Sequence, residues 1–285
     1  MGFFDQFKSM LDSKLNVDQR FELSRESVTG TMSAFRMAKD RKTEEIVGLK
    51  ILDPEKTDFF ESRFKGLRKP KEGEIAVQFD HPRIVKTLEH GVTTHGEAYL
   101  VMEYLPGPGL NALIKERNPK LVTNRVRLVR QMAEALGVVH QAGYIHRDIC
   151  PRNFICNEVV TDLTLIDFGL TVPATKEFML PGNRTGTPNY MAPEVVRRRA
   201  TDQRLDIFSL GVTCYQTCAF ELPWPGQDVT GKAAMMHDTK KPIALTEACP
   251  DVDPRMAAAI MRCLSVDPAL RPATVAEFLR EVPLE

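Results

Sequence analysis

Two carboxylates and an amide stand close together in the middle of the chain, at spacings that could support chemistry. Asp148 and Asn153 are five residues apart, and Asp167 follows fourteen residues after Asn153. Carboxylate and amide oxygens are ligands of the kind that Mg²⁺ binds, and a carboxylate can also accept a proton from a hydroxyl group. Phosphoryl transfer needs these groups, because the protein must hold phosphates with their metal ions and place a base beside the attacking hydroxyl. The three residues are therefore of the types that phosphoryl transfer uses.

These residues lie in sequence motifs that continue through the second half of the chain. The motifs are H-R-D-I-C-P-R-N at residues 146–153, D-F-G at 167–169, G-T-P-N-Y-M-A-P-E at 186–194, D-I-F-S-L-G at 206–211 and C-L-S-V-D-P-A-L-R-P at 263–272. The first two resemble the catalytic loop H-R-D-x-x-x-x-N and the metal-binding D-F-G of protein kinases. Either motif is weak alone, but their order and separation are specific. Over about residues 20–283 the chain resembles the eukaryotic-like (Hanks-type) Ser/Thr protein kinase family.

The resemblance implies an α+β, bilobal protein kinase-like fold, in which a hinge joins a small β-rich N-lobe to a larger α-helical C-lobe. The implied boundaries are an N-terminal helical extension at 1–18, the N-lobe at 19–104, and the hinge with the C-lobe at 105–285. The implied activity is transfer of the γ-phosphoryl group of ATP to Ser or Thr hydroxyls of proteins, with Mg²⁺, or alternatively Mn²⁺, as the metal ion. The alternative is a pseudokinase that binds nucleotide weakly and acts as a scaffold.

Individual residue roles follow from the same resemblance. Asp148 is expected to accept or orient the proton of the acceptor hydroxyl, and Asn153 and Asp167 are expected to bind the metal ion. Lys50 is the expected ligand of the α- and β-phosphates. Thr187, a further expected catalytic residue, lies in the G-T-P run, which favours a Ser/Thr acceptor over tyrosine. The other implied nucleotide contacts are Val28, Gly30, Phe35, Gly48, Glu72, Met102, Glu103, Leu105 and Ile155.

The acidic partner of Lys50 is expected to be Glu72, with Glu74 as the alternative. In the family the partner stands ten residues before the proline of a His-Pro pair, and counting back ten residues from Pro82 gives Glu72. Pro70 and Gly73 flank this glutamate, and both residue types disfavour a long regular helix. The helix that carries Glu72 is therefore expected to be short or displaced.

Two departures from the family pattern affect the phosphate contacts. The expected glycine-rich loop at residues 28–35 keeps only Gly30, which predicts a weaker hold on nucleotide because glycine lets backbone N–H groups approach phosphates. Cys150 stands where Ser/Thr kinases carry a lysine, and a neutral thiol cannot replace that cation. Arg152 occupies the position of an arginine in receptor-type tyrosine kinases. It either supplies the missing charge as a catalytic residue or only forms a local salt bridge.

A third departure concerns regulation. The position of a frequent activating phosphosite, three residues before Gly186, holds Asn183. Thr171, Thr175 and Thr185 remain as candidate sites, but none is well placed. Two readings follow: Arg147 pairs with a phosphate added nearby, or activity is independent of phosphorylation in this segment.

The elements that must position these residues change in character along the chain. Three antiparallel strands are expected between residues 21 and 52, and a further pair around 84–85 and 98–102. A Pro- and Gly-rich linker at 105–109 marks the hinge. Helices are expected from an N-cap at Thr123 to a stop at Gly143, then at 206–219, 254–264 and 274–282, the last with Thr274 and Glu277 at the spacing of a capping box.

Two contacts inside the second half are also predicted. Arg271 is implied by the resemblance to form a buried, structural pair with Glu194. Cys214 and Cys218 sit four apart in an apolar stretch, which indicates buried thiols rather than metal ligands.

The composition excludes several other classes of protein. Lys plus Arg and Asp plus Glu both number 38 in 285 residues, so no global field favours nucleic acid. No apolar run approaches the ~20 residues of a transmembrane helix, and the N-terminus lacks the pattern of a secretory signal. A cytoplasmic location is expected. Residues 3–15 have the apolar spacing of an amphipathic helix, which either packs on the domain or contacts a partner or a membrane surface.

Overall fold

The computed structural model describes residues 14–29, 33–64, 66–224 and 233–284. The chain forms two compact units, each with its own internal contacts. Unit 1 comprises the chain up to His81 together with Val85–Leu105, and unit 2 comprises Pro82–Ile84 together with Pro106–Glu285. The predicted helix at residues 3–15 falls almost wholly outside the described residues.

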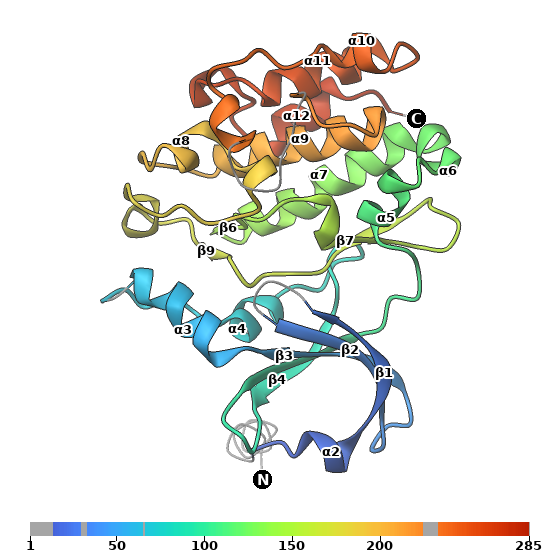
Figure 1. Cartoon of the computed structure of the whole chain (residues 1–285), viewed down its shortest axis with the longest axis vertical. Helices are drawn as coiled ribbons and strands as arrows, with labels where there is room; N and C mark the ends of the chain where they lie inside the picture. Colours follow the sequence, from blue (N-terminus) through green and yellow to red (C-terminus); the bar gives the residue numbers. More distant parts are fainter. Residues whose placement is uncertain (1–13, 30–32, 65, 225–232, 285) are drawn as a thin grey trace. The chain divides into compact units, whose positions relative to one another are not determined.

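Unit 1 is built on a five-stranded antiparallel sheet with the strand order β1-β2-β3-β5-β4 (Figure 1). The strands are β1 Phe21–Thr29, β2 Ser33–Asp40, β3 Ile46–Leu52, β4 Thr87–Val92 and β5 Ala98–Glu103. The three strands predicted between residues 21 and 52, and the strand predicted at 98–102, are confirmed. The strand predicted at 84–85 is wrong: both residues are buried, but the ladder with β5 begins only at Thr87. A short apolar run signals burial, and burial alone does not make a strand.

One side of this sheet buries an apolar cluster that also receives the start of the described chain. The cluster contains Phe21, Ala38, Val47, Leu49, Tyr99 and Val101, and the partly buried Leu15 and Val17 pack against it. Leu15 donates its amide to the carbonyl of Val92 at 3.0 Å. In the helix α2 (Val17–Arg20) the guanidinium of Arg20 binds the carboxylates of Asp40 and Glu89, both at 2.8 Å. Residues 15–20 are therefore part of the folded unit.

The helices of unit 1 are short, and for the helix that carries Glu72 this was predicted from Pro70 and Gly73. Helix α3 spans Pro54–Glu61, and a 3-10 turn, η1, follows at Ser62–Phe64. Helix α4 spans only Glu72–Ala76. It lies close against β4, because a Cβ atom at Gly73 would stand 2.6 Å from Cβ of His90. A side chain at position 73 would therefore push the helix away from the sheet.

Unit 2 is mainly helical (Figure 1). Its helices are α5 Leu110–Lys115, α6 Pro119–Thr123, α7 Arg125–Gln141, α8 Pro193–Val196, α9 Arg204–Ala219, α10 Leu245–Ala248, α11 Pro254–Cys263 and α12 Val275–Glu281. Two small antiparallel pairs join them, β6 (Tyr144–Ile145) with β9 (Val172–Pro173) and β7 (Phe154–Cys156) with β8 (Leu163–Leu165). Helix α9 is the centre of the unit, since nearly all of its side chains are buried. The two units together bear out the predicted α+β kinase-like fold.

The ends of these helices partly match the sequence predictions. Thr123 is not the N-cap of α7: it ends α6, which Asn118 caps and Pro119 begins, and α7 starts after Asn124. Gly143 stops the helix as predicted, with a φ of 81°. Thr274 caps α12 by accepting the amide of Glu277 at 3.2 Å. The Glu277 carboxylate accepts the amide of Ala273 rather than that of Thr274, so only half of the predicted capping box forms.

A buried ion pair ties α8 to the segment before α12, as the resemblance implied. Arg271 donates to both carboxylate oxygens of Glu194, at 2.7 and 2.8 Å, and its side chain is fully buried. The guanidinium lies over the ring of Phe208, 5.0 Å from its centroid, and also donates to main-chain carbonyls. A buried pair of charges needs such additional donors and acceptors to offset desolvation. The thiols of Cys214 and Cys218 are buried and free, as predicted.

Within the described ranges, no helix combines the length and the apolar composition that spanning a membrane requires.

Candidate active site

The lysine predicted to bind phosphates forms a buried ion pair inside unit 1. Nζ of Lys50, on β3, lies 2.5 Å from Oε1 of Glu72, and both side chains are about 6% exposed. Glu72 begins α4, so the short helix is sufficient to present it. Glu74, the alternative partner, instead accepts the amide of Lys71 at 2.8 Å. A buried lysine keeps its charge only beside a partner of this kind, which fixes the ammonium group in one place.

The strand register of unit 1 gathers most of the other residues predicted to contact nucleotide. Phe35 on β2 is the cross-strand partner of both Val28 and Lys50, and Gly48 on β3 is the partner of Met102. The ring of Phe35 lies over Gly48, where an added Cβ would stand 2.8 Å from Cε2 of the phenylalanine. Gly30 lies outside the described residues. Glycine at position 48 therefore lets the aromatic ring approach strand β3 closely.

The last predicted contacts of unit 1 lie at its C-terminal end. Glu103 ends β5, donates its amide to the carbonyl of Lys86 at 3.0 Å and accepts the amide of Lys86 at 2.8 Å. Leu105 is the last residue of the unit. In unit 2 the chain then passes Cys156 so closely that a Cβ at Gly107 would stand 1.8 Å from the Cys156 carbonyl oxygen. The Pro- and Gly-rich composition predicted the linker but not this requirement, because the close approach depends on a strand about fifty residues away.

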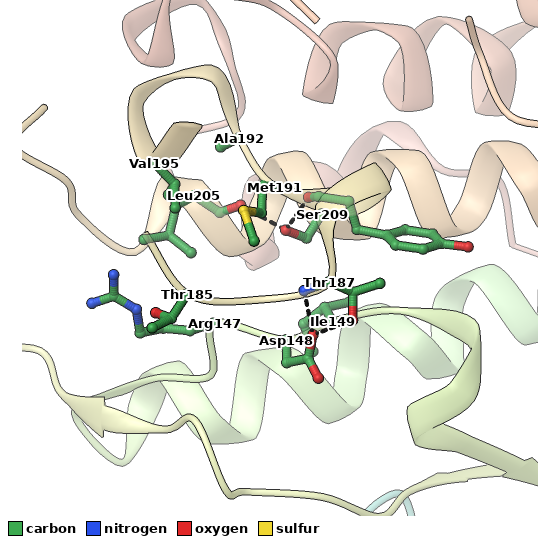
Figure 2. A pocket seen from close by; sticks show the side chains of 11 residues that line it. Arg147, Asp148, Ile149, Thr185, Thr187, Met191, Ala192, Val195, Leu205 and Ser209 are labelled. Atoms are coloured by element: carbon green, nitrogen blue, oxygen red, sulfur yellow. Dashed lines mark hydrogen bonds between the residues drawn. The ribbon is translucent and has the colours of Figure 1, made fainter. Parts of the chain in front are cut away.

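In unit 2 two of the predicted catalytic residues, Asp148 and Thr187, are in direct contact (Figure 2). Oδ1 of Asp148 accepts both the amide and the hydroxyl of Thr187, at 2.9 and 2.7 Å. Oδ2 accepts the side-chain amide of Asn153 at 3.1 Å, and the same amide donates to the main-chain carbonyl of Asp148 at 2.7 Å. Segments far apart in sequence thus hold Asp148 in one orientation.

The loop before Asp148 is fixed by hydrogen bonds to Asp206, the first acidic residue of α9. Its carboxylate accepts the amides of His146 and Arg147, both at 2.7 Å, and lies 2.9 Å from Nε2 of His140. Although burial opposes ionisation of Asp206, hydrogen bonding to His140 and to these amides holds its pKa below the usual value. Arg147 adopts a left-handed backbone conformation, with a φ of 69°, which is rare for a residue with a side chain. The anchor therefore supports a strained turn directly before Asp148.

His146 is a neutral part of this support. Burial lowers its pKa, so the imidazole is uncharged at neutral pH. Its Nδ1 therefore accepts the amide of Asp148, at 3.3 Å. The ring lies beside that of Phe168, with centroids 5.5 Å apart. The catalytic loop and the D-F-G segment are thus in direct contact.

The two residues predicted to bind metal are brought together by the main chain. The amide of Ile166 donates to the carbonyl of Asn153 at 3.0 Å, which sets Asp167 beside that residue. Oδ1 of Asp167 accepts the amide of Gly169 at 2.8 Å. Because the Asn153 amide nitrogen is turned to Asp148, its oxygen can serve as a ligand together with the Asp167 carboxylate. Mg²⁺ is commonly bound by one or two such groups plus phosphates and water, so this donor set fits it.

Comparison with known proteins agrees with this geometry. Residues 23–282 match the family model of the protein kinase domain. The chain belongs to this family. It is 30% identical over 263 residues to the serine/threonine-protein kinase pkn3 of Myxococcus xanthus, covering 89% of this chain and 47% of the relative. It is 28% identical over 275 residues to the serine/threonine-protein kinase PknB of Mycolicibacterium smegmatis, covering 92% of this chain and 42% of the relative. The chain thus spans less than half the length of these curated relatives.

Two residues of this kinase catalytic loop depart from the family pattern, and the structure gives their surroundings. Cys150 is fully buried, and burial raises the pKa of its thiol to about 12, so the side chain is neutral. Arg152 lies on the 3-10 turn η2 (Pro151–Asn153) and is exposed. Its Nη2 donates to the hydroxyl oxygen of Thr187 at 2.9 Å. Within the described part of the chain its partner is a hydroxyl rather than a carboxylate.

The activation segment, residues 167–194, is held through its main-chain carbonyls, which accept hydrogen bonds from side chains of the catalytic loop and of α9. The guanidinium of Arg147 donates to the carbonyls of Phe178 and Asn183, at 3.4 and 3.2 Å. Gly186, with a φ of 125°, passes so close to Arg147 that a Cβ would stand 2.7 Å from the arginine carbonyl oxygen. The hydroxyl of Ser209 on α9 donates to the carbonyl of Tyr190 at 2.7 Å. Sequence motifs identified these positions, but not that Arg147 binds carbonyl groups.

Proposed function

We propose that this chain is an ATP- and Mg²⁺-dependent protein kinase that phosphorylates Ser and Thr residues of other proteins. The observation that carries the proposal is the arrangement around Asp148, whose carboxylate is oriented by Thr187 and Asn153 beside Asp167. Both relatives named above are called serine/threonine-protein kinases, which supports the same acceptor class. Mn²⁺ is an alternative metal ion.

In this proposal each residue of the site has one task. ATP supplies the phosphoryl group, and the metal ion neutralises charge on its phosphates. Lys50, fixed by Glu72, binds the phosphates, while Asn153 and Asp167 hold the metal ion. Oδ1 of Asp148 is engaged by Thr187, and Oδ2, which also accepts the Asn153 amide, is the oxygen to accept the proton of the attacking hydroxyl. Positioning a base in this way typically contributes ~10²- to 10⁴-fold to rate.

The proposal also includes the remaining nucleotide contacts and the partners. Val28, Phe35, Gly48 and Met102 lie on strands of the same sheet as Lys50, which favours their assignment to the nucleotide site. Gly30, Glu103, Leu105 and Ile155 are assigned by resemblance alone. The protein substrate, the cytoplasmic location and any contact made through residues 3–15 likewise remain proposals.

The test is transfer of labelled phosphate from ATP to a generic protein substrate, with Mg²⁺ or Mn²⁺ present. Wild-type protein is compared with Asp148→Asn and Asp167→Asn, which keep the shape of each side chain but remove its charge. Transfer by the wild type at least ~10²-fold above both variants is expected. Wild-type transfer no greater than that of the variants, with nucleotide still bound, would identify a pseudokinase instead.

A further inference from the structure

The catalytic loop of this kinase lacks a positive charge at position 150. Cys150 is fully buried, and its thiol lies 3.7 Å from the hydroxyl oxygen of Thr187. Because it is neutral, it cannot offset the negative charge of Asp148 or of an incoming phosphate. A half-buried carboxylate such as Asp148 near a transferred phosphate is unfavourable without a cation nearby. Some other residue of the loop must provide that charge.

Arg152 is placed to provide it by the geometry of its own turn. Pro151 begins η2 and fixes the local backbone, so Arg152 follows Cys150 by two residues in a rigid segment. The side chain is exposed, yet its Nη2 donates to Thr187 Oγ1 at 2.9 Å across 35 residues of sequence. An exposed arginine usually gains little from a surface contact, so a contact directed at a residue bound to Asp148 indicates a specific role.

The hydrogen bonds at Thr187 define that role. A threonine hydroxyl has one proton to donate and two lone pairs to accept with. Arg152 can only donate, so Thr187 Oγ1 must accept from it, and the hydroxyl proton is left to donate to Asp148 Oδ1 at 2.7 Å. The thiol of Cys150 can donate weakly to the remaining lone pair. Arg152 therefore sets the direction of the hydrogen bond that orients Asp148.

We infer that Arg152 is the cationic positioning residue of this catalytic loop: it holds the Thr187 hydroxyl against Asp148 and supplies the positive charge that Cys150 lacks. This inference rests on the proposed kinase function. Arginine has five N–H donors, so those not bound to Thr187 remain for the phosphate or the substrate. The charge stands two residues further along the loop, at position 152 instead of 150, and contacts Thr187 from there.

The test moves the charge back to position 150. Arg152→Ala should lower kcat for a Ser/Thr peptide by roughly 10²-fold or more, the scale of losing one preorganised donor, with little change in KM for ATP. Arg152→Lys, which keeps the charge, should retain part of the activity. The double variant Cys150→Lys/Arg152→Ala should recover most of the loss. Arg255→Ala, an exposed arginine on α11 that is 73% exposed, is the matched control and should behave as wild type.

Each other outcome overturns a separate claim. Arg152→Ala with wild-type kcat would refute the inference and leave the proposed function intact. The role of charge would be refuted if kcat stayed low in both Arg152→Lys and Cys150→Lys/Arg152→Ala while thermal melts showed that these variants are folded. If Cys150→Lys fails to fold, Arg152→Lys against Arg152→Ala decides alone. A wild type no more active than Asp148→Asn would refute the proposed function, and the inference with it.

Discussion

His237 is buried in a stack of aromatic rings that does not favour its protonation. Its ring lies 4.2 Å from that of Trp224 and 5.5 Å from that of Phe208, measured between centroids. Nδ1 donates to the carbonyl of Met191 at 2.9 Å, in the segment that follows Thr187. Burial lowers the pKa of His237 from 6.5 to about 4, and the neighbouring Asp238 only partly opposes this shift. Asp238 is itself paired with Arg197.

This histidine should make the stability of the folded chain depend on pH. Between pH 6.5 and about 4 the unfolded chain binds a proton at His237 and the folded chain does not, so stability is lost as pH falls through this window. From pH 6.5 to 5.5 the wild type should lose about 1 kcal/mol more than His237→Asn, which keeps a donor for Met191 but does not titrate. Urea unfolding at both pH values measures the difference. Equal losses in the two proteins would contradict the argument.

The ion pairs of the chain could be predicted from sequence where the family's spacing identifies both residues of the pair. Glu72 for Lys50, and Glu194 for Arg271, were expected before the structure, and both pairs are present. For Arg152 the sequence left two roles open: supplying the missing charge in catalysis, or forming a local salt bridge. The partner of the exposed Arg152 side chain depends on where the segment with Thr187, 35 residues away, lies in the fold. The sequence around Arg152 does not determine that position.

The activation segment provides a prediction about regulation. Its four threonines offer little to a modifying enzyme: Thr171 and Thr185 are buried, Thr187 binds Asp148, and only Thr175 is exposed, with its hydroxyl donating to Glu177 at 2.6 Å. Arg147 is engaged by the carbonyls of Phe178 and Asn183, where a phosphate could otherwise bind. The carbonyl contacts already order the segment without added charge.

We therefore expect activity without phosphorylation of this segment. Protein treated with a phosphatase, and the variant Thr175→Ala, should both keep wild-type activity. Arg147→Ala should lower activity about tenfold or more, equivalent to ~1.4 kcal/mol, because the segment loses its contact with the catalytic loop. Mass spectrometry would confirm the phosphorylation state in each sample. A large fall on dephosphorylation, matched to a modified threonine, would refute the expectation.

Periodicity predicted the long helices and the strands next to the site, because these elements follow their own apolar pattern. It failed where tertiary contacts decide. The apolar residues at 84–85 are buried but do not belong to a strand of the sheet. Thr123, which its local sequence predicts as the N-cap of the next helix, is instead the last residue of the short helix α6. The short α4 was predictable because Pro70 and Gly73 act locally, whatever the rest of the fold does.

For the molecule as a whole, the proposed nucleotide ligands are divided between the two units. Lys50 and Glu72 belong to unit 1, while Asn153 and Asp167 belong to unit 2. A ligand that binds only the folded chain stabilises it by about 2.7 kcal/mol at one hundred times its Kd. Since 1 kcal/mol shifts Tm by roughly 2–4 °C for chains approaching this length, saturating ATP with Mg²⁺ should raise Tm by about 5 °C or more.

The same experiment tests both halves of the proposed site separately. Asp167→Asn should remove the part of the shift that requires Mg²⁺, because it takes away the carboxylate ligand, and leave any shift caused by ATP alone. Lys50→Met should reduce the shift with and without the metal ion, because the ammonium group binds phosphate directly. A wild-type shift that neither variant changes would place nucleotide binding at other residues. A shift in the wild type without phosphate transfer would leave nucleotide binding intact while refuting the catalytic proposal, so melting and transfer together separate a kinase from a nucleotide-binding scaffold.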